Sequence, residues 1–233
     1  MEEAAQDEVL TTVRNLLVTG AFSDLTVTCG SDTYKVHKNI VCSRVEFFAR
    51  AMKFGGKATN ESTVDLPDDE PAIVNLLFHW IYKGKYEPSA AKPPASSAFP
   101  KTPKKITALV PRSERLTEGE PDELLVHAKM YEIADKYYIP ELKELVKEKF
   151  SQACKLLWEA PTFGIAAHYA FSTTPDQDKG LRDIISATIA AHMKALLEKP
   201  EIEALLTEFN GLAYGLLKTQ VYPASQRNGF GMR

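Results

Sequence analysis

The sequence has few cysteines and no long apolar run. Its three cysteines, Cys29, Cys42 and Cys154, show no C-x-x-C spacing, which argues against a disulfide framework and a thiolate zinc site. No segment approaches the roughly 18 consecutive apolar residues of a membrane-spanning helix, and residues 1–8 are acidic, unlike a signal peptide. We therefore expect a soluble intracellular protein, in the cytoplasm, the nucleus or both, with no membrane partner.

The chain also has little net charge. Its 28 Lys and Arg residues against 31 Asp and Glu residues leave a formal charge of −3, so no strong field attracts nucleic acid directly. With 233 residues, 44% of them hydrophobic, the chain is long enough for one large or two small domains with a buried core.

Motifs of catalysis and metal binding are missing as well. The five histidines share no metal-ligand spacing, and there is no G-x-S-x-G elbow, Walker loop or dinucleotide fingerprint. His79 and His192 lie on or beside apolar helical stripes and are interpreted as structural. The acids at 68–70 come directly before Pro71, which indicates a helix start rather than a catalytic carboxylate pair. We therefore expect that the protein is not an enzyme and that it has no catalytic residue, no cofactor and no metal ion.

Apolar spacing predicts a helix and a hairpin at the start of the chain. Residues 1–20 form one amphipathic helix, which Gly20 is placed to end. Its apolar positions are Val9, Val13, Leu16 and Leu17. Apolar and polar residues then alternate over 24–29 and, after Gly-Ser-Asp, over 34–36, which is typical of a β-hairpin.

Capping and turn signals predict the next elements. Ser43 and Glu46 have the capping-box spacing, so we expect a helix from there through Met52. A short strand is expected over 63–66. Pro71 then lies in the first turn of a helix whose apolar positions fit one face without exception. These positions are Ile73, Leu76, Leu77, Trp80 and Ile81.

Between residues 87 and 120 apolar periodicity disappears. Seven of the 14 prolines lie in or beside this stretch, at 88, 93, 94, 100, 103, 111 and 121. The basic run at 101–105 has two interpretations, a nuclear-import or phosphate-contacting patch and a solvated loop, and its shortness favours the loop. We expect a flexible insert, dispensable for folding, because burial there is too small to offset an ordering entropy of about 1–2 kcal/mol per residue.

Helical spacing returns at Asp122. One helix has an apolar face, and Pro140 opens a second helix that runs to 150. The apolar face of the first comprises Leu124, Ala128, Tyr131, Ala134 and Tyr138. An apolar segment over 162–171 and a polar break over 172–178 follow, and then two amphipathic helices are expected over 181–196 and 200–216.

Several segments, taken in order, resemble the BTB (POZ) domain. They are Phe22-Ser-Asp-Leu-Thr-Val, Tyr34-Lys-Val-His-Lys, Val41-Cys-Ser-Arg, Phe47-Phe48, Val64-Asp-Leu-Pro-Asp-Asp, Leu76 through Tyr86, and Leu124 through Tyr137. The resemblance covers residues 8–150 apart from the insert, and an expansion at that place is similar to BTB proteins of filamentous fungi.

The resemblance implies an α+β fold, a helical cluster flanked by a small sheet, followed by a short all-helical C-terminal extension. The expected domains are a BTB/POZ domain at 1–150 with a flexible insert at about 87–120, a helical extension at 151–222 and a tail at 223–233. No kelch repeat, MATH domain or zinc-finger array accompanies the domain, so the helices after residue 150 are left to select a client.

The sequence is compatible with more than one class of function. The resemblance favours a protein-interaction module that pairs with itself and acts as a scaffold or substrate adaptor for a cullin-type ubiquitin ligase, with an unknown client. The alternatives are a nuclear, transcription-associated BTB protein without its own DNA-binding domain, and an enzyme whose site carries no recognised motif.

The resemblance also implies interaction residues. Val13, Leu16 and Leu17 on the first helix are expected to form a homodimer interface, with packing on their own chain as the alternative. Asp24 and Lys38 resemble the charged pair beside the dimer groove of BTB transcription factors, although ordinary strand-end or helix-end charges would look the same.

A second set of residues concerns the cullin. In cullin-binding adaptors the loop after the helix at 43–52 carries a hydrophobic residue two positions before a glutamate. Here Glu61 matches the glutamate, but Thr59 occupies the hydrophobic position. We therefore expect this contact to be weak.

Overall fold

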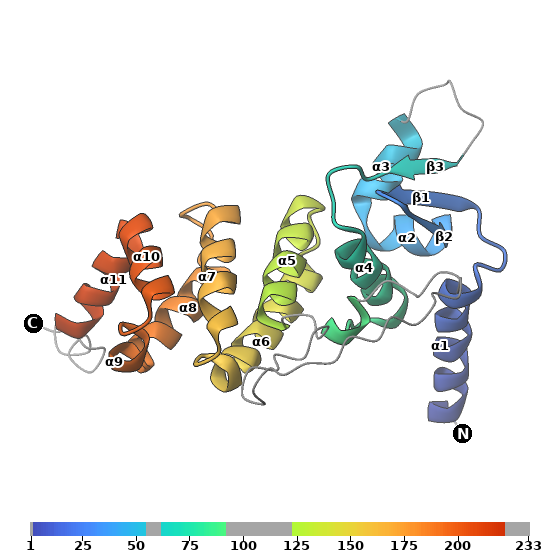
Figure 1. Cartoon of the computed structure of the whole chain (residues 1–233). Coiled ribbons are helices and arrows are strands. Elements are labelled where there is room, and N and C mark those ends of the chain that lie inside the picture. Colours follow the sequence, from blue (N-terminus) through green and yellow to red (C-terminus); the bar gives the residue numbers. More distant parts are fainter. Residues whose placement is uncertain (1, 55–61, 92–122, 222–233) are drawn as a thin grey trace, which may run out of the picture. The chain divides into compact units, whose positions relative to one another are not determined.

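The computed structural model describes residues 2–54, 62–91 and 123–221 (Figure 1). The chain divides into two compact units, Met1–Asp122 and Glu123–Arg233. The first contains α1 (Glu2–Thr19), β1 (Leu25–Cys29), β2 (Asp32–Val36), α2 (Lys38–Arg44), α3 (Glu46–Phe54), β3 (Thr63–Asp65), α4 (Pro71–Lys83) and the 3₁₀ helix η1 (Pro88–Ala91). The second contains α5 (Glu123–Lys136), α6 (Pro140–Leu157), α7 (Pro161–Thr173), α8 (Gly180–Ala191), α9 (Met193–Leu196), α10 (Pro200–Glu208) and α11 (Asn210–Val221).

The first unit holds a three-stranded sheet in the order β2-β1-β3. β1 and β2 form the predicted hairpin, and the turn between them uses Gly30 at φ +55°, which glycine adopts without strain. β3 pairs with β1 in parallel, with Val64 opposite Val27. Alternate residues of β1 are buried, as the period of two predicts: Leu25, Val27 and Cys29. Sheet and helices together confirm the α+β class.

Two predicted helices, α1 and α4, are confirmed. α1 ends at Thr19, and Gly20 follows it at φ +63° with its N–H bonded to the Leu16 carbonyl. α4 has Pro71 in its first turn. Its predicted apolar face is buried throughout: Ile73, Leu76, Leu77, Trp80 and Ile81.

The predicted capping box at Ser43 is wrong. Ser43 lies inside α2, a helix that the sequence did not indicate, and its hydroxyl donates to the Ile40 carbonyl at 3.0 Å. The break falls instead at Val45, which is buried and takes an extended conformation, so that α3 begins at Glu46. Burial of the Val45 side chain therefore decides where the helix breaks.

The start of α2 depends on a buried polar cluster around His37. The Tyr82 hydroxyl accepts the His37 backbone N–H at 2.9 Å and lies 2.7 Å from its Nδ1 atom, while Nε2 lies 2.7 Å from the Ala21 carbonyl oxygen. The tautomer with its proton on Nε2 satisfies both ring contacts. Burial raises the pKa of Tyr82 to about 12, so its hydroxyl keeps its proton. The cluster joins α4, the β2–α2 junction and the segment after α1.

The second unit is a stack of helical hairpins. α5 packs on α6, α7 on α8 and α10 on α11, and neighbouring hairpins pack through α5 on α7, α7 on α10, α6 on α8 and α8 on α11. Each hairpin thus buries apolar side chains against the next one, as in repeat proteins.

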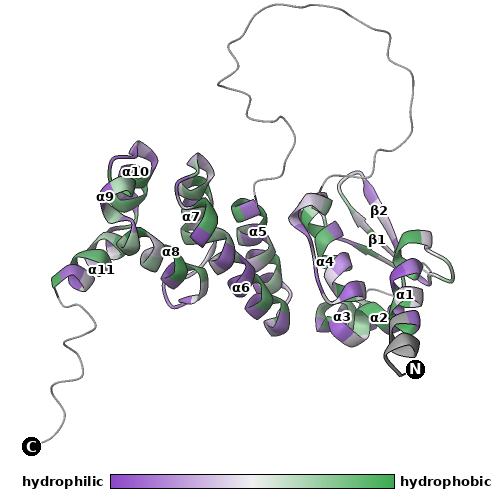
Figure 2. Ribbon diagram, turned by 90° about the horizontal axis from the view of Figure 1, so that it is seen from below, coloured by the Kyte–Doolittle hydropathy of each residue, from purple (hydrophilic) through white to green (hydrophobic). Residues whose placement is uncertain are grey.

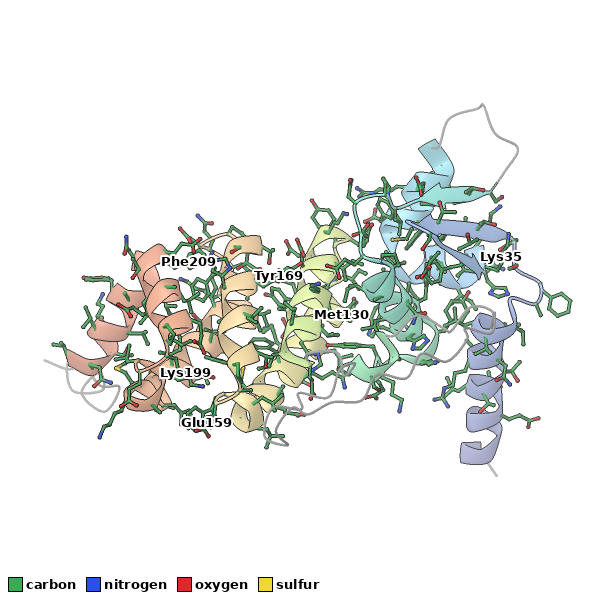
Figure 3. All side chains as sticks on the ribbon, in the orientation of Figure 1. Lys35, Met130, Glu159, Tyr169, Lys199 and Phe209 are labelled. Atoms are coloured by element: carbon green, nitrogen blue, oxygen red, sulfur yellow. The ribbon has the colours of Figure 1, made fainter. Side chains whose placement is uncertain are left out.

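Three predicted boundaries in this unit are wrong. Tyr138 lies beyond the end of α5, is 85% exposed and takes a left-handed conformation, so it does not belong to the apolar face of that helix. α6 continues beyond 150 to Leu157. The two predicted C-terminal helices are each divided, at His192 and at Phe209. The Phe209 ring, labelled in Figure 3, packs against Phe171 of α7, and the ring centroids are 5.3 Å apart. This packing accounts for the second break.

A mostly buried carboxylate, that of Asp178, holds the loop before α8 in place. Its oxygens accept hydrogen bonds from the Tyr131 hydroxyl at 2.7 Å, the Lys143 ammonium at 2.7 Å and the Gly180 backbone N–H at 3.0 Å. Burial alone would raise the pKa of Asp178, but these hydrogen bonds outweigh it and hold the pKa below its ordinary value. The polar break that the sequence indicated at 172–178 is therefore a structured connection.

Parts of the predicted organisation lie outside the described residues. This holds for residues 92–120 of the insert and for the tail at 223–233. The first residues of the predicted insert form η1, where the Asn75 side-chain amide donates to the Ala90 carbonyl at 3.0 Å. The division between the units precedes α5, whereas the predicted first domain extends to residue 150. Within the described helices, none combines the length and the apolar character needed to cross a bilayer.

Replacing Tyr82 by Phe should destabilise the first unit. The change leaves the buried His37 N–H and ring nitrogen without their partner, so the free energy of unfolding should fall by about 2 kcal/mol in urea denaturation. The exposed hydroxyl of Tyr138 offers the matched control: Tyr138→Phe should stay within about 0.5 kcal/mol of the wild type. Equal stability of the two variants would contradict the role given to the cluster.

Candidate protein-interaction surfaces

α1 displays apolar side chains that its own unit covers only in part. The helix packs on α4 and touches β2, and the predicted interface residues Val13, Leu16 and Leu17 are all half-buried. Packing on the chain itself therefore accounts for part of the stripe.

The same stripe continues toward the N-terminal end of α1. Leu10 stands at i, i+3, i+7 with Val13 and Leu17, and Val9 stands four residues before Val13. These two side chains are 48% and 63% exposed, respectively. Val18 lies outside this stripe and is 77% exposed, and Figure 2 shows hydrophobic and hydrophilic residues interleaved around α1. The uncovered part of the stripe is thus made by Val9 and Leu10.

Asp24 and Lys38 are brought together, but through the main chain. The Asp24 carboxylate accepts the Lys38 backbone N–H at 2.7 Å, which is one of the free donors at the start of α2. The Lys38 ammonium donates to the Ser62 hydroxyl at 2.5 Å. Asp24 thus acts as a helix-end charge, the alternative that the sequence left open, while its position beside the α1–β1 connection is exposed.

Thr59 and Glu61 lie outside the described residues. They fall in the segment between α3 and β3. The expected cullin contact therefore rests on the sequence.

The cysteines show no sign of nucleophilic activation. Burial raises the pKa of the Cys42 thiol, the nearby Asp24 charge raises it further, and Lys38 opposes this only in part. Burial raises the pKa of Cys154 to about 12. The Cys29 thiol donates to the Asp69 carbonyl at 3.1 Å. None of the three forms a disulfide, and each occupies a structural position.

The histidines occupy structural environments as well. His127 is 1% exposed in its side chain and burial lowers its pKa to about 4, with the nearby Lys149 acting in the same direction. Burial also lowers the pKa of the half-buried His79. His192 stacks on Trp158 with ring centroids 3.8 Å apart. Among the described residues, no three His, Cys, Asp or Glu side chains are grouped so that they could hold a metal ion.

Comparison with known proteins points to one domain family. Residues 13–97 match the model of the BTB/POZ domain. The chain is also similar to BTB/POZ and MATH domain-containing protein 6 of Arabidopsis thaliana, with 24% identity over 203 residues, which is 87% of this chain and 43% of that protein. The chain spans less than half the length of this relative.

The buried His127 predicts a loss of stability in mild acid. The unfolded histidine takes up a proton near pH 6.5, whereas the folded one resists protonation down to about pH 4. The free energy of unfolding should therefore fall by up to about 3 kcal/mol as the pH drops between these values. In urea denaturation at several pH values, the free energy of unfolding of His127→Gln should vary less with pH than that of the wild type. The exposed His168 provides the control, and an identical profile for His127→Gln and His168→Gln would contradict this account.

Proposed function

We propose that this chain, which carries a BTB/POZ domain at residues 13–97, is an adaptor that pairs with a second copy of itself and contacts a cullin-type ubiquitin ligase. The BTB/POZ domain is a protein-interaction domain, and its match to the first unit is the observation that carries the proposal. The client that the adaptor presents is an unknown protein, which the helices of the second unit are available to contact.

The uncovered apolar stripe of α1 supports self-pairing. Val9 and Leu10 continue the stripe past the part that packs on the unit, and burying them against a second copy would remove apolar surface from water. A two-fold arrangement places the same stripe on both copies, which makes the surface self-complementary.

The contact with the cullin is expected to be weak. Glu61 matches the glutamate of cullin-binding adaptors, but the methyl group of Thr59 buries much less area than a Met or Phe side chain. At about 25 cal/mol per Å² the shortfall is on the order of 1–2 kcal/mol, or roughly tenfold in affinity. Additional surface from the helices after α6 could offset this shortfall.

A charge within the uncovered stripe should separate the copies. Leu10→Glu places a carboxylate where the second copy would bury a leucine, so light scattering at tens of micromolar should report a lower mass than for the wild type. Val18→Glu, at an exposed apolar position of the same helix outside the stripe, is the matched control and should keep the wild-type mass. A wild type that is already monomeric at this concentration would remove the α1 pairing.

Calorimetry against a cullin N-terminal domain tests the second contact. We expect weak binding by the wild type, roughly tenfold tighter binding by Thr59→Met, and loss of binding by Glu61→Ala. Sub-micromolar binding by the wild type would refute the handicap assigned to Thr59. No binding even by Thr59→Met would remove the adaptor role and leave self-association in place.

A further inference from the structure

α11 contains two glycines that no contact within the second unit explains. A Cβ atom added at Gly164 would collide with Glu201, and one added at Gly180 would collide with the Tyr131 hydroxyl, so internal packing requires glycine at both. At Gly211 and Gly215, in contrast, an added Cβ would meet no described atom within 4 Å. Gly215 lies in the middle of α11, where only proline is less favourable for a helix.

α11 is also apolar on two opposite sides. Leu212 and Leu216 are each 5% exposed and face the unit. Tyr214, Leu217 and Val221 recur at i, i+3, i+7 on the other side and are 64–67% exposed. A helix with two apolar faces is typical of one packed between two neighbours. α8 has such neighbours in α6 and α11, whereas the principal contacts of α11 are with α8 and α10 (Figure 2).

The surface beside the glycines is hollow. A groove of about 750 Å³ lies between α8 and α11, and its walls include small residues from both helices. These are Ser186, Ala187 and Ala190 of α8 and Gly211 and Gly215 of α11. Small side chains let a further helix backbone approach closely, and bulky side chains spaced three and four residues apart on that helix would fill the groove.

We propose that α11 pairs antiparallel with α11 of a second copy, with Tyr214 of each copy packed over Gly215 of the other. The spacing is self-complementary, because the same register places the Lys218 stem over Gly211 of the second copy. Val221 extends the apolar contact on the Tyr214 flank.

Charge selects the antiparallel direction. Lys218 is the basic residue in the last turn of α11, and Glu208 stands just before its first turn. An antiparallel pair brings Lys218 toward Glu208 of the second copy, whereas a parallel pair would set the two lysines side by side. Glu208 is about half exposed and its partner, His168, is exposed as well, so the carboxylate is accessible.

This surface is separate from the α1 pairing and goes beyond it. A chain with two different two-fold contacts joins copies into assemblies larger than a dimer. One helix of each copy supplies this contact, so we expect a dissociation constant of about 10 μM.

Sedimentation velocity of the full chain in four forms tests the proposal. At tens of micromolar, the wild type should form assemblies larger than a dimer. The single variants Gly215→Gln and Leu10→Glu should each form dimers only, and the double variant should be monomeric. Gly215→Gln should weaken the α11 contact at least tenfold. It should also raise the melting temperature by roughly 3 °C, because glutamine is the better helix former and the space at its Cβ is open.

The outcomes separate the two contacts. If Gly215→Gln leaves the sedimentation unchanged, both in the wild type and in Leu10→Glu, the α11 pairing is overturned. A lower melting temperature with an unchanged mass would then mean that another part of the same chain covers the helix. If Leu10→Glu alone has no effect, the α1 pairing fails while the α11 pairing stands.

A charge swap tests the register. Lys218→Glu and Glu208→Lys should each weaken the contact roughly fivefold in the Leu10→Glu background, and the double substitution should restore it. Without that restoration the antiparallel arrangement is wrong.

Discussion

The first unit depends on the hydroxyl of Tyr82. Its oxygen accepts the backbone N–H of His37 and contacts the imidazole, whose other nitrogen lies at the Ala21 carbonyl. Because these groups are buried or nearly so, each needs a hydrogen-bond partner, and one arrangement satisfies them all. That arrangement sets where β2 gives way to α2 and where the segment after α1 runs. Asp24 can then reach the N–H of Lys38 at the start of α2, and α1 is held against α4 with Val9 and Leu10 uncovered.

The second unit relies on a comparable device at Asp178. Its carboxylate joins the hydroxyl of Tyr131 on α5, the ammonium of Lys143 on α6 and the first N–H of α8. Gly180 is required there because the Tyr131 hydroxyl occupies the place of a side chain. The network orients one hairpin on the next, and repetition of that packing leaves α11, the last helix of the described residues, with an uncovered apolar face. In a stack of hairpins, the apolar outer face of the terminal hairpin is shielded from water only when a further element or partner covers it.

Much of the fold could be predicted because its signals are local. The hairpin at 25–36 and the face of α4 follow from periods of two and 3.6, and the proline at 71 marks a helix start. The predicted helix boundaries were wrong where contacts between residues distant in sequence determine the end of a helix. Val45 breaks a helix by entering the core, and Phe209 does so by packing on α7, and neither residue type is a helix breaker by itself. The Asp178 network joins residues 35 and 47 positions apart, which no spacing rule detects.

The sequence by itself determined the kinds of elements, their order, and the resemblance to the BTB/POZ domain that the match at 13–97 confirmed. It also contained the spacing of Tyr214, Leu217 and Val221, but that stripe looks the same as the buried one at Leu212 and Leu216. Only the tertiary structure decided which of the two faces the unit and which faces outward, just as it decided that Val9 and Leu10 stay uncovered. The physical reason is that hydrophobic periodicity records that a face is to be buried and carries no information on whether its own chain or another one buries it.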